Sequence, residues 1–257
     1  MDFNRQVVLV TGAGQGIGQA IALAFAEEGS GVIVNDINPT TAAETAAQIN
    51  DTGGRAIAIP ADIAERQAVE AMLAQAQEQF GPVSTLVNNA GYADFMPFME
   101  YAPERWQRLL DIDLTGVYHC TQAAVPYMAA NGAGFVVNIT SVHASQTLPN
   151  MAAYAAAKAG VVALTKSLAQ ELGPKNIRVN CLSPGTIETD GLEAYFNSLP
   201  EDKRESQRAY MRSWCSMGRF GRPRDIANVV LFLCSDKAAF VHGTEIVADG
   251  GHLSRLF

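Results

Sequence analysis

Short apolar runs rich in β-branched residues alternate along this chain with longer stretches of helical periodicity. The short runs are typical of buried strands. They predict strands over Val7–Thr11, Gly31–Asn35, Ala56–Pro60, Thr85–Asn88, Phe135–Thr140, Arg178–Ser183 and Glu245–Ala248. The longer stretches are rich in alanine and predict helices over Ile17–Glu28, Thr40–Asp51, Ala64–Phe80, Pro103–Asn131, Ala152–Gly173 and Pro223–Ser235.

Strands that alternate with helices indicate a parallel sheet with helices on both faces. We therefore predict an α/β fold, a single doubly wound Rossmann-type domain over residues 1–257 with a seven-stranded parallel sheet. The segment from Thr186 to Met217 departs from this pattern, because it is polar, charged and aromatic and contains no predicted strand. We predict that residues 186–217 form a small helical lid over the cofactor crevice. The alternative is a helical excursion on the surface.

A glycine-rich turn joins the first predicted strand to the first predicted helix. Gly12, Gly16 and Gly18 have the spacing G-x-x-x-G-x-G. Glycine lets the backbone approach a pyrophosphate closely, and the N-terminus of the helix favours its negative charge. Because both the strand and the helix flank the turn, a dinucleotide site is the favoured interpretation.

Asp36 ends the second predicted strand, 18 residues after Gly18 (36 − 18). A carboxylate in this place accepts hydrogen bonds from ribose hydroxyls of the adenosine half and repels a 2′-phosphate. No Lys or Arg stands beside it, since Gln15 occupies the turn and Ile37 follows Asp36. The charge therefore predicts NAD rather than NADP. The alternative is that Asp36 only caps the next helix.

A hydroxyl, a phenol and an ammonium group come later in the chain. Tyr154 and Lys158 are four residues apart in a predicted helix, so their side chains share one face. An ammonium group beside a phenol stabilises the phenolate, and such a phenol can exchange a proton with an alcohol or carbonyl oxygen. Ser141 lies 13 residues before Tyr154 (154 − 141). The tyrosine–lysine spacing alone also fits a surface pair, but with the glycine turn it predicts hydride transfer coupled to proton transfer.

Several motifs occur in the order found in the short-chain dehydrogenase/reductase family. They are Thr11-Gly-x-x-x-Gly-x-Gly18, Asn88-Asn-Ala-Gly91, Ser141, Tyr154-x-x-x-Lys158, Ser183-Pro-Gly185 and the closing Asp249-Gly-Gly251. The chain resembles that family over essentially its whole length. Each motif alone is weak, whereas their joint occurrence in this order is specific.

The resemblance implies a catalytic set and a cofactor-binding set of residues. The catalytic set is Ser141, Tyr154, Lys158 and Asp113. The cofactor-binding set is Gly12, Gln15, Gly16, Ile17, Gly18, Asp36, Ile37, Asp62, Ile63, Asn89, Ala90, Gly91, Tyr154, Lys158, Pro184, Gly185, Ile187 and Thr189. We take as candidate substrate contacts Ser141, His143, Tyr154, Tyr92, Asn150 and Trp214, and expect His252 to lie in an interface or the tail.

The resemblance also implies roles. Tyr154 is the base in the oxidation direction, Lys158 also holds the nicotinamide ribose, and Ser141 donates a hydrogen bond to the substrate oxygen. The family usually has Asn in an Asn-Leu-x-Gly segment, where it holds a water that relays protons from the lysine. This chain has Asp113-Leu-Thr-Gly116 instead. The added negative charge near Lys158 leaves it an open question whether this chain uses the water relay. It does not affect the assignment of the Ser–Tyr–Lys core.

Charge and composition narrow the class of partner. The formal net charge of −8 argues against binding to nucleic acid or to an anionic membrane, which needs basic patches. No apolar run approaches the ~20 residues of a transmembrane helix, and no signal peptide is recognisable. The 4 cysteines are scattered, so we expect reduced thiols, no metal site and a cytoplasmic location.

The polar lid and the stretch Pro184–Asp190, which resembles that of family members acting on aldoses, predict oxidation of a sugar or polyol. The alternative is a 3-oxoacyl-thioester reductase. That enzyme usually prefers NADPH and has a basic docking patch, which Asp36 and the net charge oppose. An alternative of another class is a non-catalytic NAD-binding sensor.

We also predict a homotetramer, which the resemblance implies. The helix Ala152–Gly173 has apolar residues around much of its circumference, more than one buried face needs. The C-terminal run ends in Leu253, Leu256 and Phe257, apolar groups that a monomer seldom exposes. The alternative is that this tail folds back on its own subunit.

Overall fold

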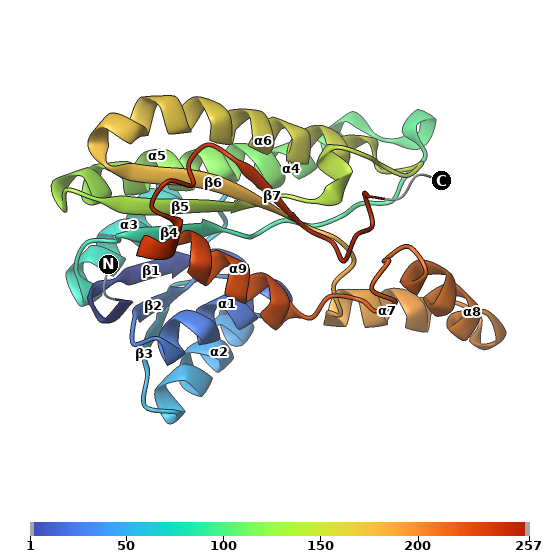
Figure 1. Ribbon diagram of the computed structural model, residues 1–257, viewed down its shortest axis with the longest axis horizontal. Coiled ribbons are helices and arrows are strands. Elements are labelled where there is room, and N and C mark those ends of the chain that lie inside the picture. The colour runs from blue at the N-terminus through green and yellow to red at the C-terminus, as the bar shows by residue number, and fades with distance from the viewer. Residues whose placement is uncertain (1–2, 255–257) are drawn as a thin grey trace.

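The computed structural model describes residues 3–254, and these form a seven-stranded parallel sheet in the order β3-β2-β1-β4-β5-β6-β7 (Figure 1). The buried strands are almost continuous runs of valine, leucine and isoleucine, as expected when helices cover both faces of a parallel sheet. The strands are β1 (Val7–Val10), β2 (Gly31–Val34), β3 (Arg55–Ala58), β4 (Thr85–Asn88), β5 (Gly134–Ile139), β6 (Ile177–Pro184) and β7 (Glu245–Ala248).

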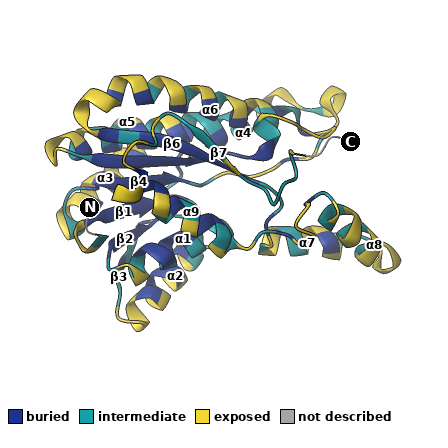
Figure 2. Ribbon diagram, viewed as in Figure 1, coloured by how far each residue is buried: buried dark blue, intermediate teal, exposed yellow. Residues whose placement is uncertain are grey.

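Helices cover the sheet on both faces (Figures 1 and 2). The helices are α1 (Gly16–Glu27), α2 (Pro39–Asp51), α3 (Arg66–Phe80), α4 (Pro103–Leu110), α5 (Gly116–Ala130), α6 (Ala152–Leu172), α7 (Asp190–Ser198), α8 (Glu201–Arg212) and α9 (Pro223–Leu233). Ile21, Ile49 and Val230 of α1, α2 and α9 belong to one buried cluster. Leu73, Met128 and Leu172 of α3, α5 and α6 belong to a second cluster on the opposite face.

The prediction of a doubly wound seven-stranded parallel sheet is confirmed. The strand order reverses direction between β1 and β4, whose residues Val8 and Thr85 are paired. Open α/β sheets bind their ligands outside the carboxyl ends of the strands at such a switch point. Within residues 3–254 no helix is both long and apolar enough to cross a membrane.

One predicted helix is interrupted by a turn that the sequence pattern does not predict. The stretch predicted over Pro103–Asn131 forms α4, a π-helical turn over Asp111–Thr115, and α5. The chain continues through the turn as a helix, so the apolar periodicity still resembles one element. π-Turns are rare and occur frequently at functional sites. Here the turn contains Asp113, which is fully buried.

The segment predicted as a lid contains two helices, α7 and α8, which lie beyond the carboxyl ends of the strands (Figure 1). Phe196 of α7 is fully buried and stacks on Phe220, with ring centroids 6.2 Å apart. The guanidinium group of Arg208 in α8 lies 4.2 Å from the centre of the Phe196 ring and pairs with Glu193 at 2.7 Å. The helix pair therefore holds together through its own contacts. That it closes over the crevice stays a prediction.

Candidate active site

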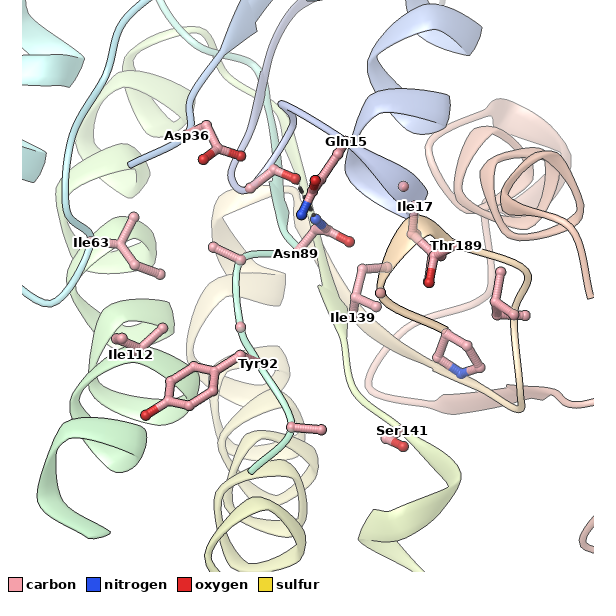
Figure 3. A pocket seen from close by; sticks show the side chains of 18 of the residues that line it. Gln15, Ile17, Asp36, Ile63, Asn89, Tyr92, Ile112, Ile139, Ser141 and Thr189 are labelled. Atoms are coloured by element: carbon pink, nitrogen blue, oxygen red, sulfur yellow. Dashed lines mark hydrogen bonds between the residues drawn. The ribbon is translucent and has the colours of Figure 1, made fainter. Parts of the chain in front are cut away.

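A cleft of about 540 Å³ lies at the carboxyl ends of the central strands. Figure 3 shows Asp36 at one end and Ser141 at the other, with Asn89 and Tyr92 between them on the wall. Thr189 stands on the opposite side of the cleft from Asn89 (Figure 3). The cleft brings together residues from many segments, including Gly12, Gln15, Gly16, Ile17, Ile37, Asp62, Ile63, Ala90, Gly91, Tyr154, Lys158, Pro184, Gly185 and Ile187.

The glycine turn after β1 requires glycine for two reasons. Gly12 and Gly16 have positive φ of 61° and 58°, which side chains disfavour. A Cβ on Gly12 would lie 2.8 Å from the Cα of Ala90, and one on Gly18 would lie 2.2 Å from the carbonyl oxygen of Gly12. The turn therefore packs directly on backbone, at the N-terminus of α1, where backbone N–H groups favour an anion.

Hydrogen bonds fasten this turn to the end of β4. The Asn89 amide Nδ2 donates to the carbonyl oxygens of Thr11 and Gly12, each at 3.0 Å (Figure 3). The backbone N–H groups of Asn89 and Ala90 donate to the Thr11 hydroxyl at 3.0 and 3.1 Å. Thr11 is thus the residue that joins the two turns, a role not assigned to it from the sequence.

Asp36 is held by backbone groups at the end of the cleft. Its Oδ2 accepts from the N–H of Gly14 and its Oδ1 from the N–H of Asn38, both at 3.0 Å. The alternative that Asp36 caps α2 is wrong, because the Asn38 side chain caps that helix by accepting from Thr40 N–H. Ile37 is exposed and brings no positive charge. A fixed carboxylate therefore stands where ribose hydroxyls are expected to bind.

Asp62 and Ile63 follow β3 and lie on the same cleft. One oxygen of Asp62 accepts from the N–H of Ala64 at 3.0 Å, and the other pairs with Arg108 of α4 at 2.6 Å. The Arg108 contact was not predicted, because Arg108 and Asp62 are 46 residues apart and only the packing of α4 joins them. The pair orients the carboxylate at the expected adenine end of the cleft.

Ser141, Tyr154 and Lys158 line the other end of the cleft. Ser141 follows β5 and caps a short 3-10 turn, where its Oγ accepts from the N–H of His143 at 3.2 Å. Because this bond uses a lone pair, the hydroxyl hydrogen stays available for a substrate oxygen. Tyr154 and Lys158 lie one turn apart at the start of α6, and the Lys158 Nζ is 5.5 Å from the centre of the Tyr154 ring.

Asp113 forms a buried ion pair with Lys158. The two side chains are 0% and 5% exposed, and Asp113 Oδ2 lies 3.2 Å from Lys158 Nζ. Asp113 Oδ1 accepts from the N–H of Tyr92 at 3.1 Å, and Lys158 also donates to the Ile139 carbonyl at 3.3 Å. A Cβ on Gly91 would lie 2.7 Å from the Asp113 carboxylate, so glycine there leaves room for the pair.

The ion pair decides the charge state of the lysine. Burial alone lowers the pKa of the Lys158 ammonium group, because charge is costly away from water. The charges of Asp113 and Tyr154 and the contact with Asp113 outweigh this effect, so the pKa of Lys158 is raised above its usual value. Lys158 is therefore a fixed positive charge beside Tyr154.

The segment after β6 borders the cleft opposite the glycine turn. The N–H of Gly185 donates to the Ala248 carbonyl at 3.1 Å, and a Cβ on Gly185 would lie 2.8 Å from the Cα of Asp249. Ile187 is buried, and Thr189 caps α7 by accepting from Leu192 N–H at 3.3 Å. This segment is thereby fixed at the position expected for the nicotinamide.

The candidate substrate residues lie in different surroundings. His143 packs edge-on against Tyr154, with centroids 5.9 Å apart, and Tyr92 borders the cleft. Asn150 is exposed with φ of 68°, and its carbonyl accepts from Met96 N–H, so it shapes the loop. Trp214 stacks on His252, with centroids 5.5 Å apart.

The C-terminal segment influences His143, an effect that the sequence did not suggest. Burial and the nearby His252 lower the pKa of His143 below its usual value. Because residues 143 and 252 are far apart in the chain, no sequence pattern joins them.

Comparisons with known proteins agree with this geometry. The family model described as enoyl-(acyl carrier protein) reductase matches residues 12–252. The chain is 37% identical over 251 residues to a 3-oxoacyl-[acyl-carrier-protein] reductase of Thermotoga maritima, covering 98% of this chain and 99% of the relative. It is 40% identical over 244 residues to the enzyme of that name from Staphylococcus aureus, covering 95% and 96%.

Solved structures give the same result. A chain from Sinorhizobium meliloti described as a proposed short-chain alcohol dehydrogenase has a TM-score of 0.92, 36% identity and 100% coverage of both chains. A proposed gluconate dehydrogenase from Agrobacterium tumefaciens has a TM-score of 0.93, 30% identity and coverage of 99% and 98%. The chain belongs to the short-chain dehydrogenase/reductase family of oxidoreductases, which bind a nicotinamide dinucleotide.

Proposed function

We propose that the protein interconverts an alcohol and a carbonyl compound with NAD(H) as its cofactor. The observation that carries the proposal is the single cleft with Ser141, Tyr154 and the buried Lys158 at one end and Asp36 at the other. This pairs a proton-transfer group with a dinucleotide-binding turn. The oxidoreductase family supports the reaction class, and the charge at Asp36 supports the choice of NAD.

The residues have separate roles in the reaction. The bound nicotinamide supplies or accepts the hydride. The Tyr154 hydroxyl gives a proton to the oxygen in the reduction direction and takes it back in the oxidation direction. Ser141 donates a hydrogen bond as negative charge develops on that oxygen, since its own lone pair already accepts from His143 N–H. Lys158 contributes a fixed positive charge, which Asp113 and the Ile139 carbonyl hold in place.

The cleft fits an NAD molecule by its chemistry. The close-packed glycine turn provides backbone N–H groups for the pyrophosphate, and a side chain at Gly12 or Gly18 would collide with neighbouring backbone. The two oxygens of Asp36 are fixed by Gly14 and Asn38 N–H, which leaves remaining lone pairs for ribose hydroxyls. A 2′-phosphate in that place would meet the carboxylate charge.

For the substrate we favour a 3-oxoacyl thioester, which would be reduced to the 3-hydroxyacyl form. The curated relatives described above carry this activity in their names, at 37% and 40% identity and nearly full coverage. Because of these relatives, we rank the thioester above the sugar or polyol, which was the first candidate substrate from the sequence alone. The sugar or polyol is the second candidate substrate. The helix pair is polar, since α8 has no buried residue and Glu193 of α7 pairs with Arg208. One similar solved structure is also described as a proposed gluconate dehydrogenase.

Steady-state rates followed by NADH absorbance test the proposal. The panel is acetoacetyl-coenzyme A with NADH, and aldoses, polyols and hydroxy acids with NAD⁺, each repeated with the phosphorylated cofactor. Turnover of the thioester with NADH supports the first candidate, and turnover of an aldose or polyol alone supports the second. Tight NADH binding without turnover of any member would favour the sensor and contradict the proposal.

A further inference from the structure

The Asp36 carboxylate lies between the glycine turn and the start of α2. Its Oδ2 accepts from the Gly14 N–H and its Oδ1 from the Asn38 N–H, both at 3.0 Å. Because Asn38 is the N-cap of α2, the second bond places the carboxylate at a helix N-terminus, where negative charge is favoured. Figure 3 shows Asp36 at the end of the cleft, beside the turn that carries Gln15. Backbone donors thus fix both carboxylate oxygens, and one of these donors belongs to Gly14.

The space around Gly14 leaves no room for a side chain. A Cβ at this position would overlap the hydroxyl oxygen of Thr41 and would lie 2.8 Å from both Asp36 Oδ2 and the Thr41 Cβ. Atoms that are not bonded to each other do not pack this closely, so one of the neighbours would have to move.

The backbone around Gly14 is held more firmly than the Asp36 side chain. The Ala13 N–H donates to the Asn35 carbonyl at 2.8 Å, and the Thr45 hydroxyl of α2 donates to the Gly14 carbonyl at 3.4 Å. The carboxylate, by contrast, can turn about its side-chain bonds at low cost. We therefore expect a side chain at position 14 to push the Asp36 carboxylate out of its place.

The backbone conformation of Gly14 does not itself require glycine. Gly12 and Gly16 have positive φ, whereas Gly14 does not. Alanine at position 14 would therefore avoid the left-handed strain that it would meet at Gly12 or Gly16. The space taken by Asp36 and Thr41 accounts for the glycine at this position.

We propose that Gly14 is a specificity-determining residue, which sets the preference for NAD over NADP by positioning the Asp36 carboxylate. The proposal rests on the proposed use of NAD(H) and adds the residue that keeps the carboxylate in place. Asp36 lines the cleft and Gly14 does not, so Gly14 acts through Asp36. A fixed carboxylate accepts from the ribose hydroxyls and repels a 2′-phosphate, whereas a displaced one loses this hydrogen-bond geometry.

The variant Gly14→Ala tests the proposal by cofactor binding alone. Dissociation constants for NADH and NADPH from fluorescence titration require no substrate, so the result does not depend on which carbonyl compound is reduced. We expect Gly14→Ala to lower the ratio of the NADPH constant to the NADH constant about tenfold, in line with one lost hydrogen bond to a charged group. The added methyl group brings no charge, donor or acceptor of its own.

Combining Gly14→Ala with Asp36→Ala separates the positioning of the carboxylate from a direct effect on the turn. If residue 14 acts through Asp36, Gly14→Ala changes the ratio by less than about twofold once the carboxylate is absent, because the two effects are not additive. Equal weakening of NADH and NADPH binding by Gly14→Ala in both backgrounds would show damage to the turn itself and would overturn the proposal.

The variant Thr41→Gly serves as control and as relief of the crowding. Alone it keeps the Gly14 N–H bond to Asp36 and should leave the ratio unchanged, although glycine in a helix lowers stability. In the Gly14→Ala protein it gives the methyl group room on the side of α2, so part of the NAD preference should return. A double variant with a ratio no higher than that of Gly14→Ala contradicts the crowding argument. The double variant also provides the test if Gly14→Ala alone does not fold.

The wild type decides the underlying preference before any variant is compared. If it binds NADPH as tightly as NADH, the choice of NAD in the proposed function is wrong, and the role of Gly14 is refuted with it. If the wild type prefers NADH and Gly14→Ala prefers it to the same degree, only the role of Gly14 is refuted.

Discussion

Replacing Asp113 with Asn tests the buried ion pair directly. The substitution keeps the shape of the side chain and removes its charge, while Lys158 stays at 5% exposure with only neutral groups and Tyr154 around it. Removing one partner of a buried pair leaves the other charge uncompensated, which costs about 3–5 kcal/mol. We therefore expect Asp113→Asn to lower the free energy of unfolding by about this amount at pH 7.

Lys158 itself sets the upper limit of this loss. If the buried charge costs more free energy than deprotonation at pH 7, the ammonium group releases its proton instead. From the ordinary pKa of 10.5, that limit at pH 7 is 3.5 units (10.5 − 7), or about 5 kcal/mol at about 1.36 kcal/mol per unit. In the wild type the folded-state pKa of Lys158 is raised. The stabilisation is therefore complete below the unfolded-state pKa and is lost as pH rises through the folded-state pKa.

Urea denaturation at fixed protein concentration measures the difference between wild type and variant. We expect the full difference at pH 7 and a difference that narrows as pH rises above 10.5, where the unfolded form loses the proton, and through the raised folded-state pKa of Lys158, where the folded form loses it as well. Asp111→Asn is the matched control, since Asp111 makes a solvent-exposed bond to Gln107 and should change stability by less than about 0.5 kcal/mol. A loss below about 1 kcal/mol for Asp113→Asn, or a difference independent of pH, would refute the ion-pair argument.

Three further outcomes follow from the cleft and the surface. Asp36→Ala should narrow the preference in kcat/KM for NAD⁺ over NADP⁺ by at least about tenfold, because hydrogen bonds to the ribose and the repulsion of a 2′-phosphate are lost; an unchanged ratio contradicts the assignment. Tyr154→Phe should lower kcat by about 10²–10⁴-fold and leave the NADH dissociation constant from fluorescence titration unchanged, whereas Lys158→Ala should lower kcat and weaken NADH binding. Substantial activity in Tyr154→Phe refutes the assigned acid–base group. We expect a homotetramer by light scattering, because the family resemblance implies one and apolar residues lie around much of α6; a monomer mass contradicts this.

The sequence predicts the sheet well because its strands are almost pure runs of valine, isoleucine and leucine. β4 (Thr85–Asn88) and β7 (Glu245–Ala248) have the predicted bounds, and the other strands differ at their ends by one or two residues. Residues at the carboxyl ends of these strands, such as Asp36 and Ser141, line the cleft as the parallel topology requires. Part of the predicted tail, Leu256 and Phe257, lies outside the described residues.

Contacts between distant segments were not predictable in the same way. The pairing of Arg108 with Asp62 depends on how α4 packs beside the end of β3, and neither residue belongs to a motif that names the other. The stacking of Phe196 on Phe220 likewise joins α7 to a loop before α9. Periodicity reports which face of an element is buried, but not which element covers it.

Irregular backbone positions Asp113, the residue at which this chain departs from the usual family motif. Tyr154 and Lys158 lie on a regular helix, so their spacing alone places them on one face. Asp113 reaches Lys158 from a π-turn between two helices. Hydride and proton transfer need only the regular scaffold that family members share. The charge balance around Lys158 depends on this irregular segment, and a variant at Asp113 should therefore change stability while leaving the type of reaction unchanged.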